Sequence, residues 1–260
     1  MDIGTAVILA GGRGTRLSEV TSVTPKPMVE IGPHPVLWHI MKGFDHFGVK
    51  RFIICAGYKA YAIKEYFLNY RLHTSDLQID LDSQSVTFHG RNTEPWQVHV
   101  VDTGMETSTG GRLKRIQDLV CDEEHFYMTY GDGLADVDLE ALGAFHRSRD
   151  EAVTVTAVRA PGRFGSLVLE GERVQEFSEK PLGDGGYISG GFFALRPRAI
   201  DVVLSDETSW EYESLPNLVA KGEVNSYRHE GFWHPMDTLR DRHELNSLWE
   251  DGSAPWKIWS

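Results

Sequence analysis

The chain lacks long apolar runs and is poor in cysteine. None of its apolar segments approaches the ~20 residues that a membrane-spanning helix needs, so a helical membrane protein is not expected. The apolar run at residues 6–10 is short and no basic residue precedes it, which argues against a signal peptide. The two cysteines, Cys55 and Cys121, have apolar sequence neighbours and cannot form a disulfide framework, so a reduced, cytoplasmic protein is expected.

Positive charge is also scarce. The 260 residues include 26 Lys and Arg against 38 Asp and Glu, a net charge of −12. Such a field repels nucleic acid and anionic membranes, so neither is expected as a partner. One segment departs from this balance, since residues 3–29 contain Arg13, Arg16 and Lys26 against Glu19 alone. An anionic substrate is therefore expected to bind near this segment.

Several catalytic motifs are missing. The 11 histidines show no His-Glu-x-x-His spacing, so zinc is not expected. No Gly-x-Ser-x-Gly string is present, which excludes an α/β-hydrolase. The string Gly11-Gly12-Arg13-Gly14 is not followed by the lysine of a Walker A loop, and Leu17 stands where a dinucleotide fingerprint needs glycine.

The order of the elements predicts an α/β fold. Residues 5–10 form an apolar run typical of a buried strand that leads into the glycine-rich string. Helical spacing follows at 36–47, a second buried strand at 51–56 and a second helix at 61–70. This order is typical of a doubly wound sheet.

The rest of the chain continues as a mixture of both element types. Further strands are predicted at 77–81, 86–89, 98–101, 126–130, 153–158, 166–169, 174–177 and 187–195, and further helices at 112–121, 139–146, 199–204, 215–221 and 239–249. No repeat or linker interrupts the chain. We therefore predict one domain over residues 1–260, a doubly wound mixed sheet with a β-rich insertion and a closing C-terminal region.

The glycine-rich string has the features of a phosphate-binding loop. Glycines after a first strand let backbone N–H groups approach phosphate closely, and a helix start adds a favourable dipole. Arg16 and Lys26, the latter in Pro25-Lys26-Pro27, supply two cations for the same phosphates.

With these motifs the chain resembles the sugar-1-phosphate nucleotidyltransferases. Gly-Gly-x-Gly-Thr-Arg-Leu with Pro-Lys-Pro is the signature of that family, and the likeness covers essentially the whole chain. Within the family it looks most like the α-D-glucose-1-phosphate cytidylyltransferases. The matching strings include Pro27-Met28-Val29-Glu30-Ile31-Gly32, Val101-Asp102-Thr103-Gly104, Thr109-Gly110-Gly111-Arg112-Leu113, Tyr130-Gly131-Asp132-Gly133, Glu179-Lys180-Pro181, Pro235-Met236-Asp237-Thr238 and residues 37–41, 94–96, 161–165, 190–193, 231–233 and 254–257.

The resemblance implies a Rossmann-like fold and a reaction. CTP and a sugar 1-phosphate are expected to give CDP-sugar and pyrophosphate with Mg²⁺ as cofactor. The sugar 1-phosphate that the resemblance favours is α-D-glucose 1-phosphate. The resemblance also implies nucleotide-sugar biosynthesis for lipopolysaccharide O-antigen and a homo-oligomer, a hexamer in the family. The aromatic residues Trp249, Trp256 and Trp259 near the C-terminus also suggest an oligomer, because so apolar an end is poorly suited to water.

Two aspartates are candidate metal ligands. Asp132 follows a predicted strand, at the edge where open α/β sheets bind ligands, and carboxylate oxygens suit Mg²⁺. By residue type alone, Asp132 and Asp237 could equally be turn formers beside their neighbours. The resemblance identifies both as metal-binding, and Arg16 and Lys26 as catalytic with them.

The remaining site residues follow from the loop and the resemblance. Glu179-Lys180 alone is more typical of an exposed charged pair, but the resemblance puts it on the sugar-phosphate side. Family members have asparagine where this chain has Ser189, which leaves the sugar open. The expected substrate-binding residues are Leu9, Ala10, Gly11, Gly12, Arg13, Gly14, Thr15, Thr107, Arg112, Gly131, Glu179, Lys180, Ser189 and Gly190.

Three alternatives remain. A uridylyl- or thymidylyltransferase would keep the same catalytic groups. A metal-dependent glycosyltransferase would carry an acidic motif like Asp132-Gly133-Leu134-Ala135-Asp136, but would not explain the glycine loop with Arg16 and Lys26. A non-catalytic, nucleotide-sensing subunit is expected to have lost one of the four catalytic residues, and all four are present.

Overall fold

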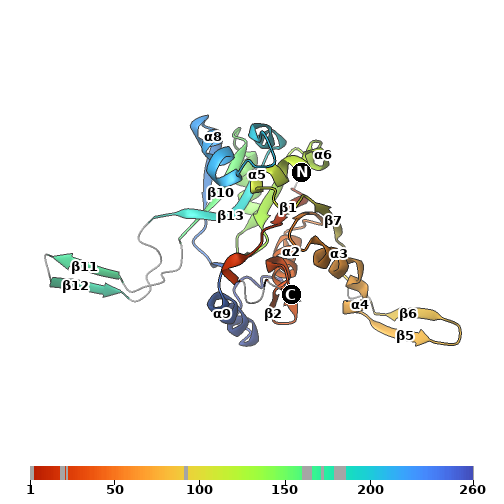
Figure 1. The fold of residues 1–260 in the computed structure, drawn as a ribbon. Coiled ribbons are helices and arrows are strands. Elements are labelled where there is room, and N and C mark those ends of the chain that lie inside the picture. Colours follow the sequence, from red (N-terminus) through yellow and green to blue (C-terminus); the bar gives the residue numbers. More distant parts are fainter. Residues whose placement is uncertain are drawn as a thin grey trace.

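A central mixed sheet organises the computed structural model, which describes residues 3–17, 21, 23–90, 93–159, 166–170, 173–178 and 186–259. Its strands are β1 (Thr5–Ala10), β4 (Arg51–Ala56), β7 (Gln97–Asp102), β8 (Phe126–Tyr130), β10 (Val153–Val158), β13 (Ile188–Leu195) and β14 (Val224–Arg228). They lie in the order β14-β10-β13-β8-β1-β4-β7 (Figure 1). This arrangement confirms the predicted fold class.

The strand directions bring the ends of β1 and β8 together. Strands β8, β1, β4 and β7 run parallel, whereas β13 is antiparallel to both of its neighbours, β8 and β10. The edge strand β14 is parallel to β10. The glycine-rich loop after β1 and Asp132 after β8 therefore emerge at the same edge of the sheet.

Helices cover both faces of the sheet. They are α2 (Val36–His46), α3 (Ala60–Leu68), α4 (Tyr70–Thr74), α5 (Thr109–Arg115), α6 (Gln117–Val120), α7 (Leu139–Arg147), α8 (Leu215–Ala220) and α9 (Leu239–Glu250). Shorter helical turns are η1 (Thr15–Leu17), η2 (Lys26–Met28), η3 (Pro197–Val202) and η4 (Trp210–Ser214), of which η4 is a π-helix. None of the helices described is long and apolar enough to cross a membrane.

The two faces of β1 belong to two apolar cores. Ile8 packs in a core with α2, α7 and α9, whereas Val7 and Leu9 pack in a second core with α5, α6 and α8. This alternation follows from the two-residue period of a strand. Strand β1 is buried along its whole length, so the loop that follows it starts from a rigid support.

Two short ladders connect distant parts of the chain near the sheet edge. Strand β9 (Gly133–Ala135) pairs with β15 (Trp233–Pro235), and β2 (Glu30–Ile31) pairs with β3 (His34–Pro35). The β9–β15 pair joins the segment after β8 to the segment before α9. None of these short strands was predicted, because two or three residues carry no periodicity.

Two hairpins project from opposite sides of the body (Figure 1). One consists of β5 (Asp76–Asp80) and β6 (Ser85–His89), the other of β11 (Ser166–Glu170) and β12 (Arg173–Ser178). Leu77, Ile79, Val86 and Phe88 alternate with polar residues and pair across the first hairpin as Leu77–Phe88 and Ile79–Val86. They therefore share one face, and Leu77, Ile79 and Val86 are exposed.

The aromatic C-terminus packs on its own chain. Trp256 is buried with its ring beside His39, and Trp249 and Trp259 pack against the same core. These tryptophans are covered within one chain and therefore do not support an oligomer, which stays a prediction from the family resemblance.

Candidate active site

A cavity of about 500 Å³ opens at the shared edge of β1 and β8. Its walls are the glycine-rich loop, Lys26 and Pro27 of η2, Gly131 and Asp132 after β8, the start of α5, and η4. Open α/β sheets bind ligands at this position, beyond the carboxyl ends of their strands. The cavity is therefore the candidate active site.

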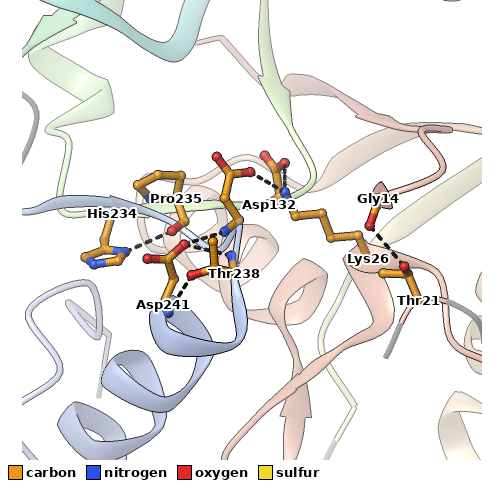
Figure 2. Close-up of polar contacts among 9 residues, drawn as sticks. Gly14, Thr21, Lys26, Asp132, His234, Pro235, Thr238 and Asp241 are labelled. Carbon is orange, nitrogen blue, oxygen red and sulfur yellow. Dashed lines mark hydrogen bonds and ion pairs between the residues drawn. The ribbon is translucent and has the colours of Figure 1, made fainter. Parts of the chain in front are cut away.

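Gly14 gives the loop after β1 its shape. Its φ of +61° is a conformation that favours glycine, and an added Cβ would meet the Thr21 methyl group at 2.9 Å. The Thr21 hydroxyl donates to the Gly14 carbonyl at 3.0 Å (Figure 2). A Cβ on Gly12 would meet no atom within 4 Å, so the loop presents open backbone to the cavity.

Lys26 lies between the two candidate metal ligands. Its Nζ donates to Oδ2 of Asp132 at 2.6 Å and to Oδ1 of Asp237 at 2.7 Å (Figure 2). The exposed fractions of the three side chains are 10% for Lys26, 32% for Asp132 and 13% for Asp237. Three residues separated by more than 100 positions of sequence thus form one partly buried ionic group.

Backbone contacts hold the two aspartates at a fixed separation. The Met236 N–H donates to the Asp132 carbonyl at 2.8 Å, continuing the β9–β15 ladder. Asp241 Oδ2 accepts from the N–H groups of Asp237 and Thr238 at 3.0 and 2.8 Å, and the Asp241 N–H donates to the Thr238 hydroxyl (Figure 2). This capping box starts α9 and positions Asp237 just before the helix.

The two carboxylates suit a divalent cation. Their oxygens converge on one point, which the Lys26 ammonium marks as a cation position. Among the residues that the structure describes, no group of three or more His, Cys, Asp or Glu side chains could hold a metal. A divalent ion between Asp132 and Asp237 would thus need further oxygens from phosphate and water, as Mg²⁺ commonly does.

Arg112 supports the loop from behind the cavity wall. It is buried, and its guanidinium donates to the carbonyls of Gly104 at 2.8 Å and Gly11 at 3.2 Å and to the Thr103 hydroxyl at 2.7 Å. An added Cβ on Gly11 would lie 2.1 Å from its Nη1, so a side chain there would displace the guanidinium from these bonds. Burial lowers the pKa of Arg112. Arg112, which was expected to bind substrate, thus also holds the glycine-rich loop in position.

The far wall of the cavity is rich in hydroxyl groups. Glu211 of η4 accepts hydrogen bonds from the hydroxyls of Tyr130, Thr109 and Ser209. Burial and the nearby Glu211 carboxylate raise the pKa of Tyr130. Tyr212 lies exposed at the rim of the same wall.

The cavity collects most of the predicted site residues. Its lining includes Leu9, Ala10, Gly11, Gly12, Gly14, Thr15, Lys26, Thr107, Arg112, Gly131 and Asp132. Asp237 reaches the same place through its bond to Lys26. The lining residues that sequence reasoning missed are Pro27, Ser108, Thr109, Tyr130, Ser209, Glu211 and Tyr212. Pro27, Thr109 and Tyr130 lay in matched strings, and nothing marked the others.

Other predicted residues lie elsewhere. Arg13 is not among the lining residues, because its guanidinium turns outward to pair with the exposed Glu106. Arg16 belongs to η1, but its side chain lies outside the described part, as do Glu179 and Lys180 altogether.

Ser189 and Gly190 stand at the start of β13, beside the cavity and not in its lining. The Ser189 side chain is exposed, and the Trp233 indole donates to the Gly190 carbonyl at 2.7 Å.

Comparison with known proteins gives consistent matches. A family model described as nucleotidyl transferase matches residues 5–252. The chain is 54% identical over 254 residues to a glucose-1-phosphate cytidylyltransferase of Salmonella typhi, covering 98% of this chain and 99% of the relative. It is 44% identical over 255 residues to a probable glucose-1-phosphate cytidylyltransferase of Bacillus subtilis, with the same coverage.

A solved structure shares the fold. A UDP-glucose pyrophosphorylase complexed with UDP-glucose superposes with a TM-score of 0.68 at 16% identity, covering 96% of this chain and 99% of that one. This likeness concerns the fold alone.

Proposed function

Because the chain belongs to the nucleotidyl transferase family, we propose that it transfers the cytidylyl group of CTP to a sugar 1-phosphate, α-D-glucose 1-phosphate in the first place. The products are CDP-sugar and pyrophosphate. The observation that supports this best is the pairing of Lys26 with Asp132 and Asp237 at the phosphate end of a glycine-lined cavity. The cytidylyltransferases to which the chain is 54% and 44% identical support CTP and glucose 1-phosphate.

The nucleophile in this reaction needs no catalytic base. A phosphate monoester has a second pKa of ~6 and is mostly a dianion near neutral pH. One of its oxygens can attack the α-phosphorus of CTP in line with the leaving pyrophosphate. The obstacle is repulsion between two polyanions, so positioning and charge neutralisation carry the catalysis.

The family generally uses a divalent metal ion, and we assign it as Mg²⁺ held by Asp132 and Asp237. When bound, the ion supplies neutralisation of charge on the α-phosphate and the attacking phosphate. The two converging carboxylate oxygens support the assignment.

The cationic side chains share the remaining charge. The N–H groups of the glycine loop and Arg16 are proposed to stabilise the departing pyrophosphate. Lys26 is proposed to hold the phosphate under attack, and Lys180 the incoming sugar phosphate, although these two roles could be exchanged. Arg112 acts on the nucleotide through the loop, since it holds the Gly11 carbonyl.

We also propose that residues 1–260 form one domain and that the protein is a homo-oligomer. The support for the oligomer is the β5–β6 hairpin, which projects from the body (Figure 1). Its apolar face consists of Leu77, Ile79, Val86 and Phe88, and none of these four belongs to either apolar core of the described residues. An isolated two-stranded hairpin is at best marginally stable in water. A second copy of the chain is the partner that we propose for this face.

A screen for pyrophosphate release tests the reaction. CTP, UTP, dTTP and GTP are each mixed with Mg²⁺ and a panel of sugar 1-phosphates, and CTP with glucose 1-phosphate is expected to give the highest kcat/KM. A higher kcat/KM with UTP or dTTP would reassign the base. A glycosyltransferase or a sensing subunit would release no pyrophosphate from any pair.

The same screen tests the sugar. Ser189 is exposed beside the cavity, and a serine hydroxyl offers fewer hydrogen bonds than an asparagine amide. Ser189→Asn is therefore expected to raise kcat/KM for glucose 1-phosphate relative to its epimers. If the substitution changes every sugar by the same factor, Ser189 has no part in specificity.

A further inference from the structure

The ammonium group of Lys26 lies between Asp132 and Asp237, where the proposed reaction requires a metal ion. Its Nζ is within 2.7 Å of both Asp132 and Asp237, so the oxygens of these carboxylates already bind one positive charge. Magnesium–oxygen distances are ~2.1 Å, so an ion held by the same two oxygens would overlap the ammonium group. The lysine and a metal ion therefore cannot both occupy the position between these two oxygens.

From this geometry we infer that Lys26 is an exchangeable counter-ion: it neutralises the aspartates while no metal is bound and transfers its charge to the nucleotide phosphates as the metal enters. The inference rests on the proposed function for the identity of the metal site. It makes Lys26 the element that couples metal binding to nucleotide binding.

The backbone around Lys26 restricts the movement to its side chain. Lys26 lies between Pro25 and Pro27 in η2, where the Met28 N–H donates to the Pro25 carbonyl and the Val29 N–H to the Lys26 carbonyl. Only the four-carbon stem is left to change its torsions. Lys26 therefore exchanges partners by rotation, with no rearrangement of the sheet edge.

The second position of the ammonium group is available beside the first. Lys26 lines the cavity together with Gly11, Gly12 and Thr15, and its Cβ lies 3.2 Å from where a Cβ on Gly14 would stand. The stem thus runs along the loop to which we assign the phosphates. Along this loop, a lysine that leaves the two aspartates would meet the phosphates of a bound nucleotide, because Glu211 lies on the far wall of the cavity and is already bonded to three hydroxyls.

This exchange makes the two ligands cooperative. Without nucleotide, a metal ion must displace the ammonium group into a cavity where, apart from Asp132, the one carboxylate among the described lining residues is Glu211, which already accepts from three hydroxyls, so metal binds weakly. With nucleotide, the displaced charge is neutralised, so metal binds more tightly. Linkage requires the reverse effect as well: metal strengthens nucleotide binding by the same factor.

Manganese affinity in the absence of nucleotide tests the inference. The signal of free Mn²⁺ in electron paramagnetic resonance gives a Kd for wild type and for Lys26→Met, which removes the competing charge. Lys26→Met is expected to bind Mn²⁺ at least about tenfold more tightly, within the 5- to 150-fold range of typical couplings. An unchanged or weaker affinity in a folded Lys26→Met protein overturns the inference.

Two control variants locate the effect. Lys42→Met removes another partly buried lysine, which pairs with Glu94 away from the cavity, and is expected to bind Mn²⁺ like wild type. The double variant Lys26→Met, Asp237→Asn is expected to lose the gain, because one ligand is neutral. A double variant that keeps the gain places the manganese elsewhere and overturns the inference.

If Lys26→Met does not fold, a crystal structure of the wild-type protein with metal and nucleotide bound tests whether Lys26 changes partners. In wild type with Mn²⁺ and α,β-methylene-CTP, Lys26 Nζ should lie on a phosphate, out of reach of at least one carboxylate. Lys26 still bonded to both aspartates would overturn the inference. Manganese affinity without nucleotide does not depend on which base or sugar reacts. A negative result in the substrate screen therefore contradicts the proposed function and leaves the result for Lys26 unaffected.

Discussion

Asp132 and Asp237 contribute charge to the site and little to the core. Each bonds Lys26 from the cavity side, and their backbones are held by neighbouring ladders and a helix cap. Changing one to asparagine leaves Lys26 with the other carboxylate. The fold is therefore expected to survive a substitution that removes one ligand of the proposed metal site.

Asp132→Asn and Asp237→Asn are each expected to lower kcat by ~10²–10³ or more, because a charge that stabilises the transition state is lost. Pyrophosphate release at limiting Mg²⁺ measures the rate, and thermal unfolding checks the fold. Asp201→Asn, an exposed carboxylate bonded only to Gln117 among the contacts that the structure describes, serves as the control. A near wild-type rate in either variant would show that the metal assignment is wrong.

Residue patterns predicted one wall of the cavity and not the other. The glycine loop and Lys26 have a chemistry that can be stated from residue type and spacing, whereas Asp132 and Asp237 were identified through the family resemblance. Glu211 could not be found in this way, because no spacing marks a carboxylate that is brought in by η4. Its position depends on Trp210, which is fully buried in the second core.

At the scale of elements, apolar periodicity predicted most of the longer strands and helices and failed for segments with a weak apolar pattern. Strand β1 and helix α2 lie where their apolar residues indicated, within one residue. Strand β14 was missed, because its sequence Val-Asn-Ser-Tyr-Arg packs at an edge with little burial. The helix predicted at 112–121 begins earlier, at Thr109, and breaks at Ile116 into α5 and α6.

The β5–β6 hairpin is the element on which the proposed assembly depends. Light scattering is expected to give a multiple of 29.3 kDa for wild type at micromolar concentration. The double variant Leu77→Glu, Ile79→Glu puts charge on the apolar face and is expected to shift the particle toward smaller mass. Gln78→Glu changes the opposite face and is the control. A wild-type particle of 29.3 kDa rejects the oligomer.

At the scale of the whole molecule, two buried histidines link stability to pH. Burial lowers the pKa of His39 to about 4 and that of His146 to about 3. Both side chains are almost fully buried, at 1% and 0% exposed. In the unfolded chain their pKa is ~6.5, so below that pH the unfolded state binds protons that the folded state excludes. The contribution of these neutral histidines to the free energy of unfolding is therefore fully present above pH 6.5. It decreases as the pH falls from 6.5 toward the pKa values of the folded state.

The free energy of unfolding in urea is expected to fall by about 1.4 kcal/mol per histidine between pH 7.5 and 5.5. His39→Gln should be less stable at pH 7.5, because the ring bonds the Ile31 carbonyl, but should lose about 1.4 kcal/mol less on acidification. His243→Gln, at an exposed position, should keep the wild-type pH dependence. Equal pH dependence in all three proteins would contradict the buried-histidine explanation.

The distance along the chain between Lys26 and Asp237 has a consequence for synthesis. A chain emerges from the ribosome N-terminal end first, and its early strands can begin to pair before the rest is made. Asp237, just before α9, follows Lys26 by 211 residues, and Trp256, which docks beside His39, is made later still. A nascent chain therefore displays its glycine loop long before the segment that carries Asp237 has been made, and the ionic group of Lys26 with the two aspartates cannot be completed until then.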